Sequence, residues 1–234
     1  MARDNFGENR FGSGFYGSGE RGNDRSTKLL LHCNGIDGSV NFIDSSYNLY
    51  AVTTIGSVAI DTAQSKFGGA SALFTGTGDY LSVPTSDDWN FKNNSWTIDT
   101  WVMLNVFPGT SQKLHILKIP GALDWYIKNS SGTTQIGWDL EFGGSGLSQF
   151  DSYAFTTGNW LHLVFEYTKD NLKLGYSVDG SNPKGSGGFA INLSDSASAI
   201  LIGSNLNGWI DEFRVSKGVC RWFGAFSPPD REYD

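Results

Sequence analysis

The chain has 234 residues, of which 39% are apolar, and a formal net charge of −7. This length suits one large domain, because all-β sandwiches often reach it as a single unit. The acidic balance and the scattered lysines and arginines argue against nucleic acid as a partner. No apolar run is long enough to span a membrane, and the charged start MARDNFGENR is unlike a signal peptide. We therefore expect neither a membrane partner nor a signal peptide.

Residues 1–27 lack the periodicity of a helix or a strand, and they are rich in glycine. Such a segment cannot bury enough apolar area to offset a backbone entropy cost of about 1–2 kcal/mol per residue. We predict a non-globular N-terminal arm over 1–27 and one domain over 28–234. The arm is either a linker or an anchor that binds a partner. The anchor interpretation rests on its aromatic and arginine side chains, which are Phe6, Arg10, Phe11, Phe15, Tyr16 and Arg21.

After the arm, short β-rich segments recur about every ten residues, separated by glycine turns. Residues 29–33, 70–74, 80–83 and 96–104 are predicted strands in the first half of the chain. Residues 172–178 alternate apolar and polar side chains and stop at Asp179-Gly180, which predicts a strand with one solvated face. The strands at 200–202 and 210–215 are the last. No long amphipathic helix is evident, so the sequence predicts a two-sheet antiparallel β-sandwich of the jelly-roll type.

The strand from Trp160 has Leu161, Leu163, Phe165 and Tyr167 on one face, and we expect that face in the core. His162 lies on the opposite face and is predicted to be a packed or surface histidine. Cys33 and Cys220 are each interpreted as a small buried apolar residue, and a bond between them stays open.

Eight segments occur in an order typical of one family. They are LLLHCNGIDGS at 29–39, KFGGASALFTGTGDYLSV at 66–83, WTIDTWV at 96–102, GNWLHLVFEY at 158–167, LKLGYSVDG at 172–180, ILIGS at 200–204, GWIDEFRVSKGVCRW at 208–222 and FSPP at 226–229. Together they resemble the laminin-G-like, concanavalin-A-like jelly-roll family, whose architecture is shared by lectins and glycoside hydrolases.

The resemblance raises hydrolysis as a function. Hydrolases of this fold carry three alternating acids on one strand, and the nearest match here is Gly137-Trp138-Asp139-Leu140-Glu141, with glycine in the first acidic position. Asp139 and Glu141 alone are about 7 Å apart along a strand, which suits an inverting mechanism only by accident. We predict a protein that is not an enzyme, and a degenerate glycoside hydrolase stays the third alternative.

The same strand supplies a surface. Its apolar side chains alternate with Asp139 and Glu141, and the preceding segment alternates in the same way. If the two strands pair, one face carries Asp124, Tyr126, Lys128, Asp139 and Glu141. This face is either an ordinary solvated surface or a sugar-binding groove in which a ring offers a stacking platform.

Sandwiches of this resemblance frequently hold a structural calcium ion, and Asp211 matches a position used in that way. Asp37 and Asp44 could complete its oxygen shell. The alternative is that Asp37 forms a turn and Asp211 is a surface strand residue. No cofactor is required by either interpretation.

Domains that end in a KGVCRW-like strand and FSPP resemble those of tailed-phage structural proteins. We therefore expect a phage virion protein, assembled in the host cytoplasm, whose arm binds other virion proteins of the capsid or tail. Its sandwich would decorate the particle or bind host-surface glycans. A free carbohydrate-binding module is the main alternative, and whether the protein forms a homo-oligomer stays open.

Overall fold

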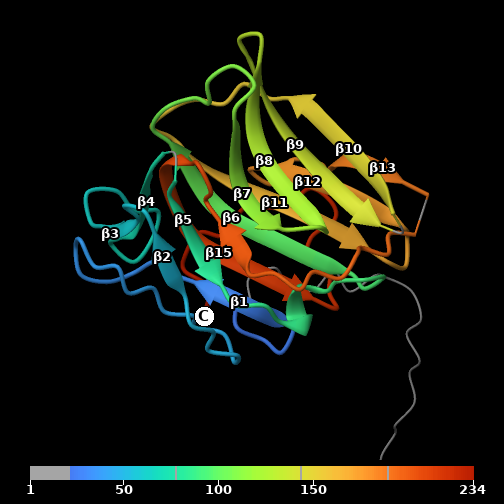
Figure 1. The fold of residues 1–234 in the computed structure, drawn as a ribbon, viewed down its shortest axis with the longest axis horizontal. Coiled ribbons are helices and arrows are strands. Elements are labelled where there is room, and N and C mark those ends of the chain that lie inside the picture. The colour runs from blue at the N-terminus through green and yellow to red at the C-terminus, as the bar shows by residue number, and fades with distance from the viewer. Residues whose placement is uncertain (1–21, 77, 143, 189) are drawn as a thin grey trace, which may run out of the picture.

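The computed structural model describes residues 22–76, 78–142, 144–188 and 190–234. These residues form two antiparallel sheets packed face to face, with one 3-10 turn, η1 (Asp87–Trp89), and no α-helix (Figure 1). The predicted two-sheet sandwich is thereby confirmed. No helix among the described residues is long and apolar enough to cross a membrane. The predicted anchoring residues Phe6, Arg10, Phe11, Phe15, Tyr16 and Arg21 lie outside the described residues.

The larger sheet has eight strands in the order β13-β12-β11-β6-β15-β4-β3, and β1 pairs with β15 beside this path. The strands are β1 (Thr27–Leu31), β3 (Ala59–Asp61), β4 (Ser71–Thr75), β6 (Trp96–Leu104), β11 (Trp160–Thr168), β12 (Lys173–Val178), β13 (Lys184–Gly187) and β15 (Asn207–Lys217). The long strands β6, β11 and β15 lie at its centre, because their β-branched and aromatic residues suit a sheet that is covered on both faces.

The smaller sheet has seven strands in the order β10-β9-β8-β7-β14-β5-β2. The strands are β2 (Thr53–Ile55), β5 (Tyr80–Val83), β7 (Lys113–Ile119), β8 (Leu123–Ser130), β9 (Thr133–Phe142), β10 (Ser145–Ser152) and β14 (Ile200–Ile202). The strands β7 to β10 are consecutive in sequence and form a meander, so short turns fix their register.

The core fills the space between the two sheets. The Phe165 ring of β11 stacks on Trp125 and Trp138 of the facing sheet, with ring centroids 5.7 and 5.8 Å apart. Leu163 and Tyr167 are also fully buried on this side of β11. The predicted core face of β11 is therefore confirmed, and Trp160 at its start is half-buried.

Much of the outer face of the eight-stranded sheet is covered, although Lys173 at the start of β12 is exposed. Gly175 and Ser177 on β12 are buried, so the prediction of a wet face on this strand was wrong. The segment 218–234, which has no strand of its own, lies over part of this face, and Pro183 and Lys184 lie next to Gly175. His162 is fully buried beneath the rings of Trp222 and Phe226, so it is a packed histidine as expected. Gly180 is required where this segment passes, because a side chain there would meet the Phe226 carbonyl oxygen at 1.9 Å.

Residues 22–27, which the sequence places in the arm, pack on the same side of the domain. The Asn23 amide donates to the Asp234 carbonyl at 2.7 Å, and Arg221 donates to the Asp24 carboxylate at 2.9 and 3.1 Å. The cysteines are both free: Cys33 is buried, and Cys220 donates its thiol to Glu166 at 3.2 Å.

Candidate functional site

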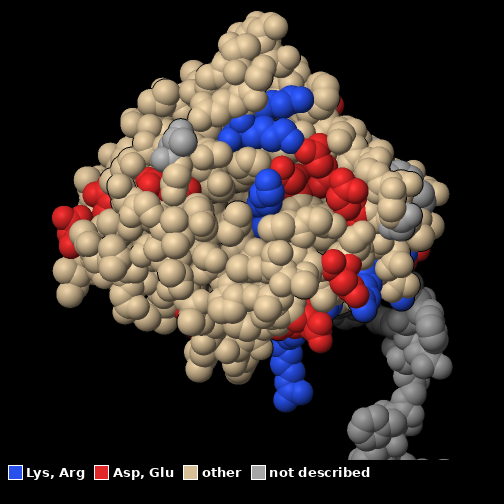
Figure 2. Space-filling model, in the orientation of Figure 1, with Lys and Arg blue, Asp and Glu red and all other residues tan. Residues whose placement is uncertain are grey.

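The pairing of β8 with β9 brings the five predicted sugar-binding residues onto one face. Asp124 lies opposite Asp139, and Tyr126 lies opposite Gly137 in the register. Trp125, Trp138 and Leu140 point the other way, into the core. Figure 2 shows basic and acidic side chains side by side on this outer face of the seven-stranded sheet. Their role in binding sugar stays a prediction.

The neighbouring strand β7 adds two residues that the sequence analysis missed. Lys113 places its Nζ 2.5 Å from the Asp139 carboxylate and 3.8 Å from that of Asp124. His115 Nδ1 lies 2.5 Å from Asp124 Oδ1. Polar Lys113 and His115 alternate with buried Leu114 and would have indicated a strand, but a bulge between His115 and Leu117 ends the alternation.

Tyr126 supports this face rather than offering a platform. The residue is only 2% exposed: the Lys113 ammonium lies 3.8 Å from the ring centroid, and Gly137 lies against the ring edge. Its hydroxyl donates to Asp139 at 3.1 Å. Burial and the negative charges of Asp139 and Asp124 raise the pKa of this hydroxyl, so it remains a donor. The expectation that Tyr126 is the stacking ring is therefore wrong in this geometry.

Phe150 is the exposed ring of this face. It lies on β10 opposite Gly137, its side chain is 49% exposed, and the Lys128 ammonium lies 3.3 Å from its centroid. The sequence signal was weak, because Leu147 is the only other apolar side chain of β10 and glycine and polar residues make up the rest.

The glycine at 137 is explained by these two rings. A Cβ atom there would lie 2.8 Å from Tyr126 Cε2 and 3.0 Å from the Phe150 Cβ. No acidic side chain fits at this position unless the rings move. The departure from the three-acid pattern therefore follows from the packing of the face.

The electrostatics of Asp139 oppose proton donation. Burial raises the pKa of this carboxyl, but hydrogen bonds from Lys113 and Ser148 and the charge of Lys113 outweigh burial and hold it below the usual value. Asp139 is thus a permanent acceptor near neutral pH.

A hollow lies where the strands β7, β8 and β9 meet the 119–123 turn. Its volume is about 370 Å³, and Asp124, Asp139 and the exposed Glu141 line one side of it. The remaining lining residues are Lys118, Ile119, Pro120, Gly121, Ala122, Leu123 and Ser194. Carboxylate acceptors and a lysine therefore converge on a space of ligand size.

The three carboxylates expected to hold calcium do not come together. Asp37 Oδ1 accepts from Thr62, Asp44 accepts from the amides of Leu30, Ser46 and Tyr50, and Asp211 accepts from those of Lys66 and Phe67. Within the described part of the chain, no three histidine, cysteine or acidic residues form a group that could hold a metal ion. These residues therefore do not fit a shared calcium shell.

The fold and this site can be set against known proteins. Residues 75–221 match the model of the concanavalin A-like lectin/glucanases superfamily, which covers more than half of the chain. The chain belongs to this superfamily. A comparison with curated protein sequences gave no match to this chain.

Several solved structures share the fold of this chain. The binding domain of Paraclostridial Mosquitocidal Protein 1 superposes with a TM-score of 0.64 at 16% identity, over 84% of this chain and 50% of the other. Domain 4 of AbnA, a GH43 extracellular arabinanase from Geobacillus stearothermophilus, was solved with arabinotriose. It superposes with a TM-score of 0.56 at 19% identity, over 88% and 97% of the two chains.

A third structure is the binding domain of botulinum neurotoxin DC in complex with SialylT. Its TM-score is 0.56 at 17% identity, over 84% of this chain and 49% of the other. The chain spans about half the length of the mosquitocidal-protein and neurotoxin chains. At these identities the likeness establishes a shared lectin-like sandwich and nothing finer.

Proposed function

We propose that this protein is a non-enzymatic carbohydrate-binding domain and that the outer face of β7 to β10 binds the glycan. The observation that carries the proposal is the open cluster of Lys113, Asp124, Asp139 and Glu141 beside the exposed ring of Phe150. Similar structures were solved with arabinotriose and with SialylT, which supports a sugar as the ligand class.

The chemistry of the face suits sugar hydroxyls, which both donate and accept hydrogen bonds. Asp139 and Glu141 supply acceptors, Lys113 supplies donors, and Phe150 supplies an apolar surface for the C–H face of a ring. Lys113 is already held by Asp124 and Asp139, so little side-chain entropy is lost on binding.

Two features favour binding over hydrolysis. A general acid needs a raised pKa, whereas that of Asp139 is lowered. Position 137 has no room for the third acid of the hydrolase pattern. We therefore assign Asp139 to ligand contact.

The N-terminal residues support display of this face from a phage particle. Gly22 lies against Tyr233 on the outer side of the eight-stranded sheet, opposite the glycan face. An arm that leaves at this point can attach to the capsid or tail while the polar face points outward. We propose this virion role, with residues 1–21 as the attachment segment.

The glycan proposal is tested on an array of defined glycans with full-length protein and the variants Glu141→Gln and Asp139→Asn. Each variant is expected to weaken binding by about tenfold or more, because a charged hydrogen bond is lost. Asp170→Asn, at an exposed turn of the other sheet, is the matched control and should bind as the wild type does. Unchanged binding by both groove variants would refute the proposal.

The virion proposal is tested by deleting residues 1–21 only, since residues 22–27 pack on the domain. The shortened protein should fold and bind glycans but fail to join purified phage particles, as followed by mass spectrometry. Normal incorporation would contradict the attachment role of the arm.

A further inference from the structure

A second pocket lies at the opposite end of β8 and β9 from the acidic hollow. Its volume is about 580 Å³, and three segments line it: the connection before β7, the β8–β9 turn, and the stretch that follows β10. The lining residues are Phe107, Asn129, Gly132, Thr133, Thr134, Ser152, Tyr153, Ala154 and Phe155. Asp124 and Asn129 are five residues apart on β8, so the two spaces are separated by about 17 Å along the strand.

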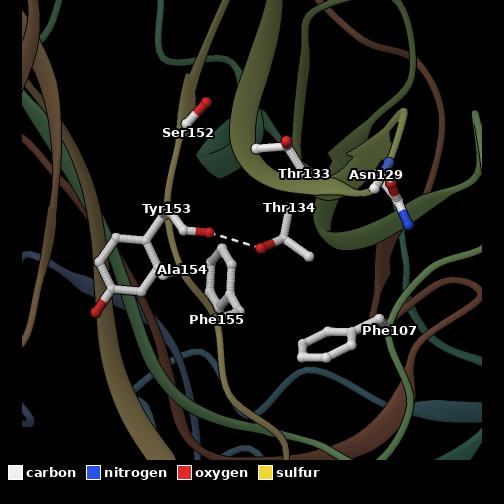
Figure 3. Close-up of a pocket in the computed structure, with 9 residues that line it drawn as sticks. Phe107, Asn129, Thr133, Thr134, Ser152, Tyr153, Ala154 and Phe155 are labelled. Atoms are coloured by element: carbon white, nitrogen blue, oxygen red, sulfur yellow. Dashed lines mark hydrogen bonds between the residues drawn. The ribbon is translucent and has the colours of Figure 1, made fainter.

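The lining of this pocket is aromatic and polar, and none of the described residues that form it is charged. Figure 3 shows the rings of Phe107 and Phe155 on two sides of the space, with Thr134 between them. Phe155 is buried and packs edge-on against Tyr153 at a centroid distance of 4.7 Å, whereas Phe107 is 40% exposed. One ring is thus fixed by the fold, and the other presents a free surface.

Hydrogen bonds hold the walls of the pocket in place. The Thr134 hydroxyl donates to the Tyr153 carbonyl at 2.6 Å, and the Tyr153 amide donates to the Thr134 carbonyl at 3.1 Å. Asn129 donates to the Pro108 carbonyl at 3.1 Å and accepts from the Gly132 amide at 2.9 Å. These bonds join all three lining segments, so the pocket exists before any ligand binds.

Polar groups remain available at the rim. The hydroxyls of Thr133 and Ser152 make no hydrogen bond to another described residue. An ionic ligand would lose hydration here without a counter-charge, and a wholly apolar ligand would leave these hydroxyls unpaired where it displaces water. A ligand with one apolar face and a polar edge meets both conditions.

We infer that this pocket binds one uncharged sugar residue, with its C–H face on Phe107 and its hydroxyls on Thr133 and Ser152. The site is separate from the acidic face of the proposed function. A long oligosaccharide could then contact the domain at two points along β8 and β9.

The test uses isothermal titration of the full chain with four neutral trisaccharides: maltotriose, cellotriose, arabinotriose and tri-N-acetylchitotriose. At least one trisaccharide is expected to bind, and Phe107→Ala should lower its affinity about tenfold because the contact with the ring is lost. Thr133→Val, which keeps the shape and removes the hydroxyl, should weaken it about threefold. Val106→Ala is the matched control, because Val106 is exposed beside Phe107 but does not line the pocket.

Amide NMR shifts locate the binding. Shifts at residues 132–134 and 152–155 are expected with the trisaccharide that binds, and Glu141→Gln should leave its affinity unchanged. The inference is overturned if none of the four probes shifts these amides at about 10 mM, if Phe107→Ala binds as the wild type does, or if Glu141→Gln weakens the same probe equally. A different result would refute the proposed function: unchanged binding of Glu141→Gln and Asp139→Asn to the glycan array.

Discussion

The two outer faces of the sandwich use the same ion-pair chemistry under opposite conditions. On the eight-stranded sheet, Arg214 donates to both carboxylate oxygens of Asp99 at 3.0 and 3.1 Å, and both side chains are fully buried. On the seven-stranded sheet, Lys113 and Asp139 pair at 2.5 Å with about a third of each side chain exposed. Water screens the second pair and not the first. The buried pair therefore matters for stability, whereas the exposed pair contributes little to stability and is accessible to a ligand.

The buried pair is part of a network that fastens the segment 218–234 to the sheet. Tyr233 donates its hydroxyl to Asp99, and the Arg214 guanidinium lies 3.7 Å from the centroid of the Tyr233 ring. Burial raises the pKa of the Asp99 carboxyl, but the charge of Arg214 and the neighbouring His162 imidazole outweigh burial and lower the pKa. Glu166 accepts from the amides of Trp222 and Phe223 at 3.3 and 2.6 Å.

The largest expected effect comes from breaking the buried pair. Arg214→Met should lower the free energy of unfolding by about 3–5 kcal/mol, because it leaves Asp99 buried without its counter-charge. Urea unfolding measures this loss. The double variant Arg214→Met with Asp99→Leu is the control. It removes the unpaired buried charge and should recover part of the stability, but not the part that comes from the hydrogen bond that Asp99 accepts from Tyr233. A loss below about 1 kcal/mol in the single variant would contradict the role of the pair.

The next effect concerns the fastening of the C-terminal segment. Tyr233→Phe should cost about 1.5–3 kcal/mol, because it removes a buried hydrogen bond to a charged carboxylate and keeps the ring. The exposed Tyr47 is the matched control, and Tyr47→Phe should leave thermal unfolding unchanged. Equal midpoints for the two variants would show that Tyr233 acts through packing alone.

A smaller effect is the pH dependence set by Asp211. Burial raises the pKa of this carboxyl from 3.8 to about 7, and the charge of Glu212 adds to this. The folded protein therefore binds this proton more tightly than the unfolded chain. The stabilisation is complete below pH 3.8 and is lost as the pH rises through about 7.

Unfolding free energies at about pH 8 and about pH 6 measure this contribution. Asp211 should add roughly 1 kcal/mol at the lower pH. Asp211→Asn is expected to lose that gain. Burial lowers the pKa of His162, so this histidine has the opposite effect on stability as the pH falls. Subtracting the pH profile of the variant from that of the wild type cancels the contribution of His162, which both proteins share. Parallel pH profiles for the two proteins would refute the assignment.

The smallest effect on stability is expected on the open face. Lys113→Met should change the free energy of unfolding by about 0.2–1 kcal/mol, because its ion pairs are exposed. Glycan binding should nevertheless fall strongly, since a donor is lost. A large destabilisation without a change in binding would invert the comparison between the two faces.

Most of the sandwich could be predicted because its strands alternate with period two between glycine turns. The shared face of β8 and β9 was predictable for the same reason, since a short turn joins them and fixes their register. The covering of His162 and Ser177 was not, because residues 218–234 have no periodicity and reach the sheet through isolated contacts. The contact of Lys113 with Tyr126 was not predictable either, because the strand of Lys113 loses its alternation at a bulge.

The hydrogen bond between Asn23 and Asp234 brings the first described residues and the last into contact. A protein fused after residue 234 would therefore emerge beside residues 22 and 23, on the side away from the polar face. Both connections of the domain converge on one point, so it can be grafted between two flanking sequences without spreading them apart. Circular permutation through a short linker at this point should likewise preserve the strand order of both sheets.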